Sequence, residues 1–268
     1  MTNPKAETLK SKLELDKVEL TEPARGVELA WTTALVRGFL PGAKWELLGD
    51  TTLPVEPGEA MHKWIWGDGA ARLTVAVFVS SDGPLVARRR LVTLATENMR
   101  PDVPFIRGPA DLGDVSTIFA VPPAFAHLIW AYTNVCVAIK TQDAPGIDVT
   151  NIAAAMQEHL ARHVVPRVKG ATPQIEHAEP SLKQVPVGTP LTIRLRMRSE
   201  DAPRELQVAI KERNSTLRIA GDLGLVTTLS VDTPGPRKLT MMVADKSTLL
   251  STWASVIFEV TPPAPVND

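Results

Sequence analysis

The pattern of hydrophobic and polar positions changes character between residues 164 and 190. Before this stretch, strand-like runs alternate with helix-like ones. After it, short alternating runs are separated by Pro, Gly, Asn and Asp, and none is typical of a helix. Such a change indicates two domains. The sequence therefore predicts an α+β unit followed by an all-β unit, joined by a linker at 166–173.

Two longer segments of the first part carry helical periodicity. One is 85–98, and the other is 149–164, where apolar residues recur every four positions after the capping residue Asp148. A short helix is expected within 27–39, and strands are predicted at 44–48, 60–66, 72–79, 115–121 and 127–140. This order predicts a two-layer α+β domain at 25–165, an antiparallel sheet with two main helices. Residues 1–24 are expected to form a mobile or loosely docked arm.

The second part has the clearest period-two pattern in the chain. In the segment 191–198, apolar residues at every second position alternate with polar ones, which predicts a half-buried strand. Further strands are predicted at 205–212, 216–220, 225–231, 237–244 and 253–260. Strands and turn signals at this spacing predict an all-β sandwich over 174–262, followed by a tail at 263–268.

Part of this sandwich resembles a known family. The stretch from Val187 to Val260 resembles bacterial immunoglobulin-like or polycystic-kidney-disease-type domains, on its opening Gly188-Thr-Pro-Leu-Thr-Ile and its closing segment 234–245. The resemblance implies an immunoglobulin-like sandwich and carries no catalytic residue. Domains of this kind commonly serve as spacers or adhesive modules on exported proteins.

The first part is similar in element order to small α+β domains of unassigned function in bacterial envelope proteins. The resemblance lies in the predicted strands 115–121 and 127–140, which precede the helix at 149–164. It favours an envelope setting. The N-terminus has no apolar segment typical of a signal peptide. The sequence thus leaves two alternatives open, a cytoplasmic protein if Met1 is the native start, and a periplasmic or exported one if a leader was removed.

Charge and cysteine content narrow the classes of partner. The 268 residues carry a net charge of −1, and the two parts divided at Gly170 are each close to neutral. Nucleic-acid binding normally needs a clustered basic surface, so another protein is the expected partner. No run of apolar residues is long enough to predict a membrane span. The single Cys136 excludes an intramolecular disulfide, and its strand context predicts a core position.

Tryptophan is unusually frequent relative to the single tyrosine. Trp64 and Trp66 lie two residues apart on one predicted strand, so both project from one face of the sheet, and Trp130 lies on another strand. These indoles are either core residues beneath the helices or an exposed platform that binds a partner. The core interpretation is favoured, with at least one of the pair buried beside Trp130. Trp253 is expected to anchor the core of the second unit.

His159 and His163 are the best candidates for a metal site, because an i, i+4 pair on a helix can offer two imidazoles to one ion. The pair lacks the glutamate of a His-Glu-x-x-His motif. The favoured interpretation is therefore that both histidines complement the negative end of the helix. His62 and His127 are expected to be packed or rim residues, and no cofactor is predicted.

The sequence thus favours a non-catalytic binding or assembly protein. In this hypothesis the α+β domain recognises a partner, with Trp64, Trp66 and Trp130 as candidate binding residues, and the β-sandwich acts as a spacer or docking module. The alternative is a metal-dependent hydrolase that uses His159 and His163.

Overall fold

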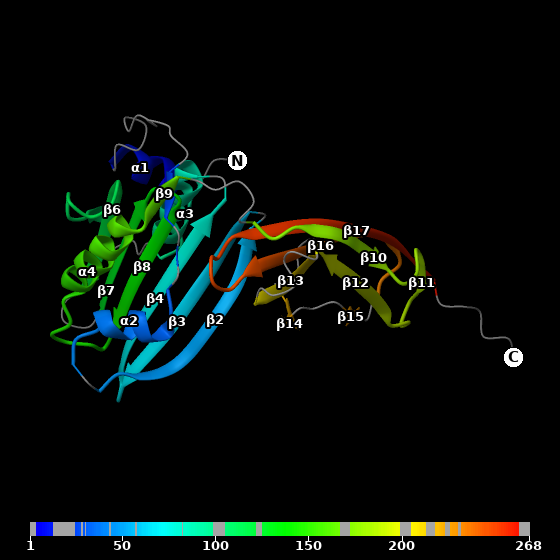
Figure 1. The fold of residues 1–268 in the computed structure, drawn as a ribbon, viewed down its shortest axis with the longest axis horizontal. Coiled ribbons are helices and arrows are strands. Elements are labelled where there is room, and N and C mark those ends of the chain that lie inside the picture. Colours follow the sequence, from blue (N-terminus) through cyan, green and yellow to red (C-terminus); the bar gives the residue numbers. More distant parts are fainter. Residues whose placement is uncertain are drawn as a thin grey trace, which may run out of the picture. The chain divides into compact units, whose positions relative to one another are not determined.

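The chain is mostly β, with large antiparallel sheets and four helices among the residues that the structure describes (Figure 1). The structure is a computed structural model. It describes residues 4–12, 25–27, 29, 31–42, 44–56, 58–81, 83–98, 105–121, 125–166, 172–198, 205–212, 218–222, 226–229 and 232–262. The chain divides into two units. One comprises Met1–Thr52, Met61–Lys169 and Ser247–Leu249, and the other comprises Leu53–Ala60, Gly170–Lys246 and Leu250–Asp268.

A seven-stranded sheet forms the centre of the first unit, with the strand order β2-β3-β4-β8-β7-β6-β5. Its strands are β2 (Glu46–Glu56), β3 (Glu59–Asp68), β4 (Ala71–Ser80), β5 (Ile106–Arg107), β6 (Val115–Val121), β7 (Phe125–Tyr132) and β8 (Val135–Gln142). From β4 to β5 along this order, neighbouring strands pair antiparallel. A separate pair joins β1 (Arg25–Val27) to β9 (Val164–Pro166).

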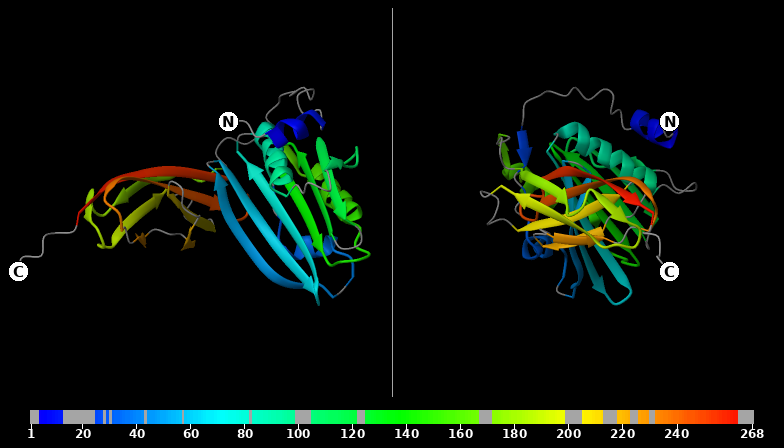
Figure 2. Two further views of the ribbon diagram at one scale, coloured as in Figure 1. Left: turned by 180° about the vertical axis from the view of Figure 1, so that it is seen from behind. Right: turned by 90° about the vertical axis from the view of Figure 1, so that its right-hand side faces the viewer.

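Helices cover both faces of this sheet, which corrects the two-layer prediction. They are α1 (Pro4–Lys12), α2 (Thr33–Phe39), α3 (Pro84–Glu97) and α4 (Val149–Arg162). Figure 1 shows α2 and α4 in front of the sheet. The left view of Figure 2, which is turned by 180°, shows α1 and α3 on the opposite face. The unit therefore has three layers.

Side-chain contacts agree with this assignment of faces. Trp130 pairs with Val137, which in turn pairs with Val77, so the neighbouring Phe78 points to the opposite face. Trp130 donates a hydrogen bond to Gln157 of α4, whereas Arg90 of α3 lies over the Phe78 ring. A sheet that is covered on both faces needs apolar residues at consecutive positions rather than at alternating ones. The runs 75–79, 128–131 and 135–139 are buried throughout.

The predicted long strand 127–140 is wrong, because the chain reverses within it. β7 and β8 are joined at Thr133 and Asn134, and Thr133 has a φ of 49°. Asn134 stabilises this turn: its Oδ1 accepts a hydrogen bond from the Val27 amide at 2.8 Å, and its Nδ2 donates to the Ser80 carbonyl at 3.3 Å. The turn is thus tied to two other parts of the unit.

The N-terminal segment differs from the predicted arm within its described residues. Pro4–Lys12 forms α1, whose Leu9 is buried, and α1 contacts α3. Residues 13–24 lie outside the described part of the chain. Other local predictions are confirmed: Asp148 caps α4 by accepting from the amides of Thr150 and Asn151, and Cys136 is buried. No described helix is long and apolar enough to cross a membrane.

The second unit is a β-sandwich of two sheets. Its strands are β10 (Ile175–Pro180), β11 (Gln184–Pro186), β12 (Leu191–Met197), β13 (Leu206–Glu212), β14 (Arg218–Asp222), β15 (Val226–Leu229), β16 (Gly235–Asp245) and β17 (Ser251–Thr261). One sheet has the order β10-β12-β15, and the other has the order β11-β17-β16-β13-β14. Buried residues of both sheets share one core, which contains Ile193 from the first sheet and Met241 and Phe258 from the second.

Trp253 does not anchor this core, contrary to expectation, because its side chain is 48% exposed. On β17, the even-numbered residues Val256, Phe258 and Val260 belong to the core. Alternation along a strand therefore directs Trp253, at an odd-numbered position, to the outer face.

Candidate functional site

The three tryptophans that sequence reasoning singled out in the first unit are buried. Trp64 and Trp130 have no exposed surface, and Trp66 has almost none, so the expectation that at least one of the pair is buried is confirmed. Trp130 Nε1 donates to Gln157 Oε1 at 3.0 Å, and Trp64 Nε1 donates to Thr33 Oγ1 at 3.2 Å. These indoles pack in the core and do not form an exposed platform.

His159 and His163 stack on each other instead of converging on an ion. Their ring centroids are 4.2 Å apart with an interplanar angle of 27°, and His163 Nδ1 lies 2.7 Å from the His159 carbonyl oxygen. The nitrogen lone pairs lie in the ring planes, so the lone pairs of two stacked rings lie in separate, nearly parallel planes and do not converge on one ion. No group of three or more His, Cys, Asp or Glu side chains in the described residues could hold a metal ion. The metal-site alternative is therefore not supported.

His159 is a packing residue in this arrangement. Its ring also contacts the rings of Trp31 and Phe39 edge-on, at centroid distances of 6.2 and 5.8 Å. Burial lowers the pKa of His159 below its ordinary value, and the nearby His163 and Arg162 lower it further. The imidazole of His159 thus packs between the rings near α2 and the C-terminal end of α4.

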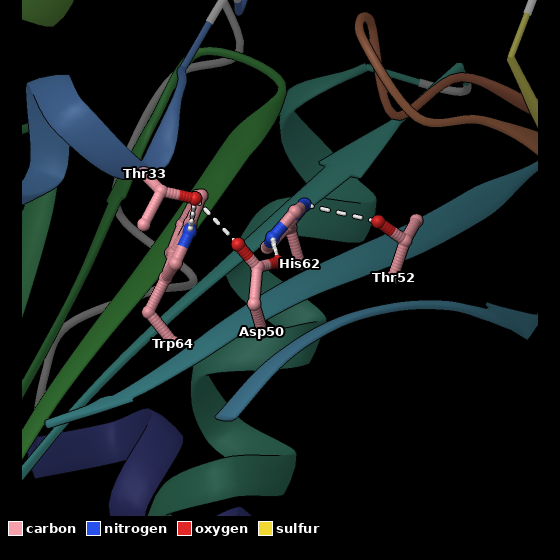
Figure 3. A network of polar contacts seen from close by, with 5 residues as sticks. All are labelled: Thr33, Asp50, Thr52, His62 and Trp64. Carbon is pink, nitrogen blue, oxygen red and sulfur yellow. Dashed lines mark hydrogen bonds and ion pairs between the residues drawn. The ribbon is translucent and has the colours of Figure 1, made fainter. Parts of the chain in front are cut away.

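A polar network that sequence reasoning missed joins β2, β3 and the start of α2 (Figure 3). Asp50 and Thr52 lie two residues apart on β2, and His62 and Trp64 lie two residues apart on β3, so each pair shares a face. His62 Nε2 lies 2.5 Å from Asp50 Oδ1, and Thr52 Oγ1 lies 3.0 Å from His62 Nδ1. Thr33 Oγ1 donates to Asp50 Oδ2 and accepts from Trp64.

The donor and acceptor roles of Trp64, Thr33 and Asp50 follow from their chemistry. Trp64 can only donate, so the Thr33 hydroxyl accepts from it and donates to Asp50. The other carboxylate oxygen of Asp50 pairs with His62 Nε2, and His62 Nδ1 shares a hydrogen bond with the Thr52 hydroxyl. Each of these groups is thus satisfied by a partner on another element, and the network holds β2 and β3 against α2.

A hydroxyl, an imidazole and a carboxylate in a row are also the groups of a nucleophilic catalytic triad. Thr52 is only 6% exposed, however, so its hydroxyl is not presented to a substrate. His62 stacks on Trp64 with ring centroids 3.9 Å apart and an interplanar angle of 19°. The imidazole of His62 is thus held by an indole, a carboxylate and a hydroxyl. Such a network is typical of side chains that stabilise the position of a strand.

The network around His62 lies beside an exposed apolar stretch of β2. Among the described strands, β2 is the terminal one of the seven-stranded sheet, and its neighbour in the sheet order is β3. On this strand Leu47 is 43% exposed and Leu48 is 52% exposed, and both are large apolar side chains. Successive residues of a strand point to opposite faces, so the two leucines extend the apolar surface to both sides of the strand. We call Glu46–Asp50 the β2 edge, and it is the candidate interaction site.

Comparison with known proteins does not assign this site. No family model matches the sequence, and no curated protein matches it. Two similar solved structures are the N-terminal four Ig domains of Dscam1 isoform 6.9 and of Dscam1 isoform 6.44, each at 10% identity and a TM-score of 0.27. Both matches cover 83% of this chain, which spans 53% and 54% of those chains respectively. TM-scores this low do not establish a shared fold.

Proposed function

We propose that this chain is a non-catalytic binding or assembly protein, in which the first unit recognises another protein and the β-sandwich spaces or docks it. The observation that carries this proposal is the β2 edge, where Leu47 and Leu48 are exposed on the two faces of a terminal strand. Terminal strands that present apolar residues are sites of pairing with another chain. The network around His62 supports the proposal because it holds this strand in place next to the leucines.

The strand order of the second unit supports an immunoglobulin-like sandwich. In that fold, strands A, B and E lie in one sheet, and G, F, C and C′ lie in the other. The orders β10-β12-β15 and β17-β16-β13-β14 correspond to these two series, and β12 and β16 pair with their neighbours antiparallel. We propose an immunoglobulin-like sandwich after an α+β unit and, by analogy of fold, a bacterial envelope setting.

Replacing both edge leucines by lysine is expected to weaken capture of the partner about tenfold or more, since central apolar contacts dominate binding energy. A photo-crosslinking amino acid at position 48 of the full chain is expected to give one adduct of defined mass in the native lysate. The same amino acid at position 182 is the matched control, because Leu182 is 48% exposed and lies in the second unit. Equal adducts at both positions, or an adduct that survives Leu47→Lys, would refute the proposed site.

The proposed division at 166–173 predicts where the chain is cut. Two prolines, a glycine and few apolar residues make up this segment, of which residues 167–171 lie outside the described part of the chain. Limited proteolysis is expected to cleave there first and to leave two resistant fragments. Mass spectrometry of the fragments checks this, and first cuts within 25–165 would contradict it.

A further inference from the structure

We infer that the partner contributes an extended, basic segment that adds to the seven-stranded sheet along the β2 edge. This inference rests on the proposed function and names the chemistry of its partner.

The first argument concerns the shape of the occupant. Leu47 and Leu48 are both exposed, and they point to opposite faces of the sheet. A helix that packs on one face would reach one of these side chains only. An added strand lies level with the sheet, and its alternating side chains reach both faces. The edge therefore fits an extended segment better than a helix.

The second argument concerns charge. β2 has the sequence ELLGDTTLPVE, with three carboxylates and no Lys or Arg. Glu46 and Asp50 flank the two leucines, and both are exposed, although the Asp50 carboxylate also pairs with His62 and Thr33. The lysines nearest to β2 in sequence lie outside it: Lys44 precedes the strand, and Lys63 lies on the neighbouring β3. A strand beside β2 thus faces carboxylates in its own row, and opposite charges in directly facing positions stabilise a sheet.

The same charges argue against a second copy of this chain as the occupant. Two β2 strands side by side would bring six carboxylates and no cation into one seam, because each contributes three. Like charges that face each other across a sheet are destabilising. A different, basic segment removes this repulsion.

The length of the pairing is limited by Pro54. Proline has no backbone N–H and cannot donate to an added strand, and prolines are confined to sheet edges for this reason. Pairing is therefore expected along the β2 edge itself and to weaken towards Pro54.

Selection of peptides from a random library tests this inference. A phage-displayed library of peptides of about ten residues, the length of a long strand, is panned against the full chain. In parallel the library is panned against the Leu47→Lys/Leu48→Lys variant. Both selected pools are sequenced, and the peptides enriched on the unchanged chain alone are compared. Peptides rich in Lys, Arg and β-branched residues and poor in Asp, Glu and Pro are the expected result.

A selected peptide is then methylated at one backbone nitrogen at a time. Its affinity is expected to fall about tenfold at every second position, since alternate amides of a strand face its neighbour.

The outcomes separate the inference from the proposed function. No enrichment over the double-lysine variant would overturn both, because the edge would then not recognise peptides. Enrichment without a preference for basic residues, or methylation effects without period two, would overturn the inference alone. The Glu46→Lys variant is expected to lose the basic preference, whereas Glu97→Lys, which makes the same change at an exposed position of α3, is expected to retain it.

Discussion

Replacing Trp130 by alanine is expected to lower the free energy of unfolding of the first unit by about 3–5 kcal/mol, the cost of removing a large side chain from a packed core. Trp130 is fully buried in β7, and its indole N–H donates to Gln157 Oε1 on α4. The variant leaves a cavity, and it also leaves Gln157 Oε1 without its hydrogen-bond donor. The loop before β6 also packs against this indole, because a Cβ at Gly113 would lie 2.9 Å from Trp130 Cδ1, so the loop loses this contact in the variant.

Chemical denaturation followed by tryptophan fluorescence measures this loss. The signal reports mainly on the first unit, since five of the six tryptophans precede the linker. Trp253→Ala is the matched control: its side chain is 48% exposed, and the expected loss is below about 1 kcal/mol. Similar losses in both variants would contradict the assignment of Trp130 to the core.

Local signals in the sequence predicted most of the elements. The strand 115–121 is β6 as predicted, and the helix predicted at 85–98 is α3 within one residue at each end. The cap at Asp148 and the period-two run from Leu191 were likewise correct. These features depend on residues that are close in sequence, so the pattern itself contains the information.

Features that depend on distant residues were not predicted. The number of layers was wrong, although continuous apolar runs such as 135–139 are typical of strands buried on both faces. The turn at Thr133 gave no signal, because β-branched residues are uncommon at positive φ. It is stabilised by contacts of Asn134 with Val27 and Ser80, which are far away in sequence.

The candidate site shows the same limit. The pairs Asp50 and Thr52, and His62 and Trp64, are recognisable as same-face positions, but their contact depends on the register of β2 and β3. Exposure of Leu47 and Leu48 depends on the sheet order, which places β2 at an edge. Alternation predicts the faces of a strand and says nothing about which strand is terminal.

The protonation of His127 is expected to make the stability of the first unit depend on pH. His127 lies on β7 among the rings of Phe105 and Phe125, and its Nδ1 is buried without a partner among the described residues. Burial, together with the smaller effect of the positive charge of Lys140 on the facing strand, lowers the pKa of His127 from 6.5 to about 4. The folded protein thus keeps this imidazole neutral where the unfolded chain takes up a proton.

The sign of the effect follows from the two pKa values. The unfolded chain binds more protons than the folded protein between pH 6.5 and about 4, so the free energy of unfolding falls as the pH is lowered through this window. The full loss is about 3 kcal/mol, at 1.4 kcal/mol for each unit of pKa difference. Above pH 6.5 the residue is neutral in both states, and below pH 4 it is protonated in both, so the contribution is constant outside the window.

Replacing His127 by phenylalanine isolates this contribution, because the new ring packs among phenylalanines and carries no proton. The difference in unfolding free energy between the variant and the wild type is expected to shift by about 3 kcal/mol in favour of the variant as the pH falls from 6.5 to 4. His159, whose pKa is also lowered, is present in both proteins, so its contribution cancels. His127→Leu is expected to give the same shift, since the effect comes from the titrating group and not from the shape of its replacement. A difference that stays constant across the window in both variants would show that His127 is not held neutral in the folded protein.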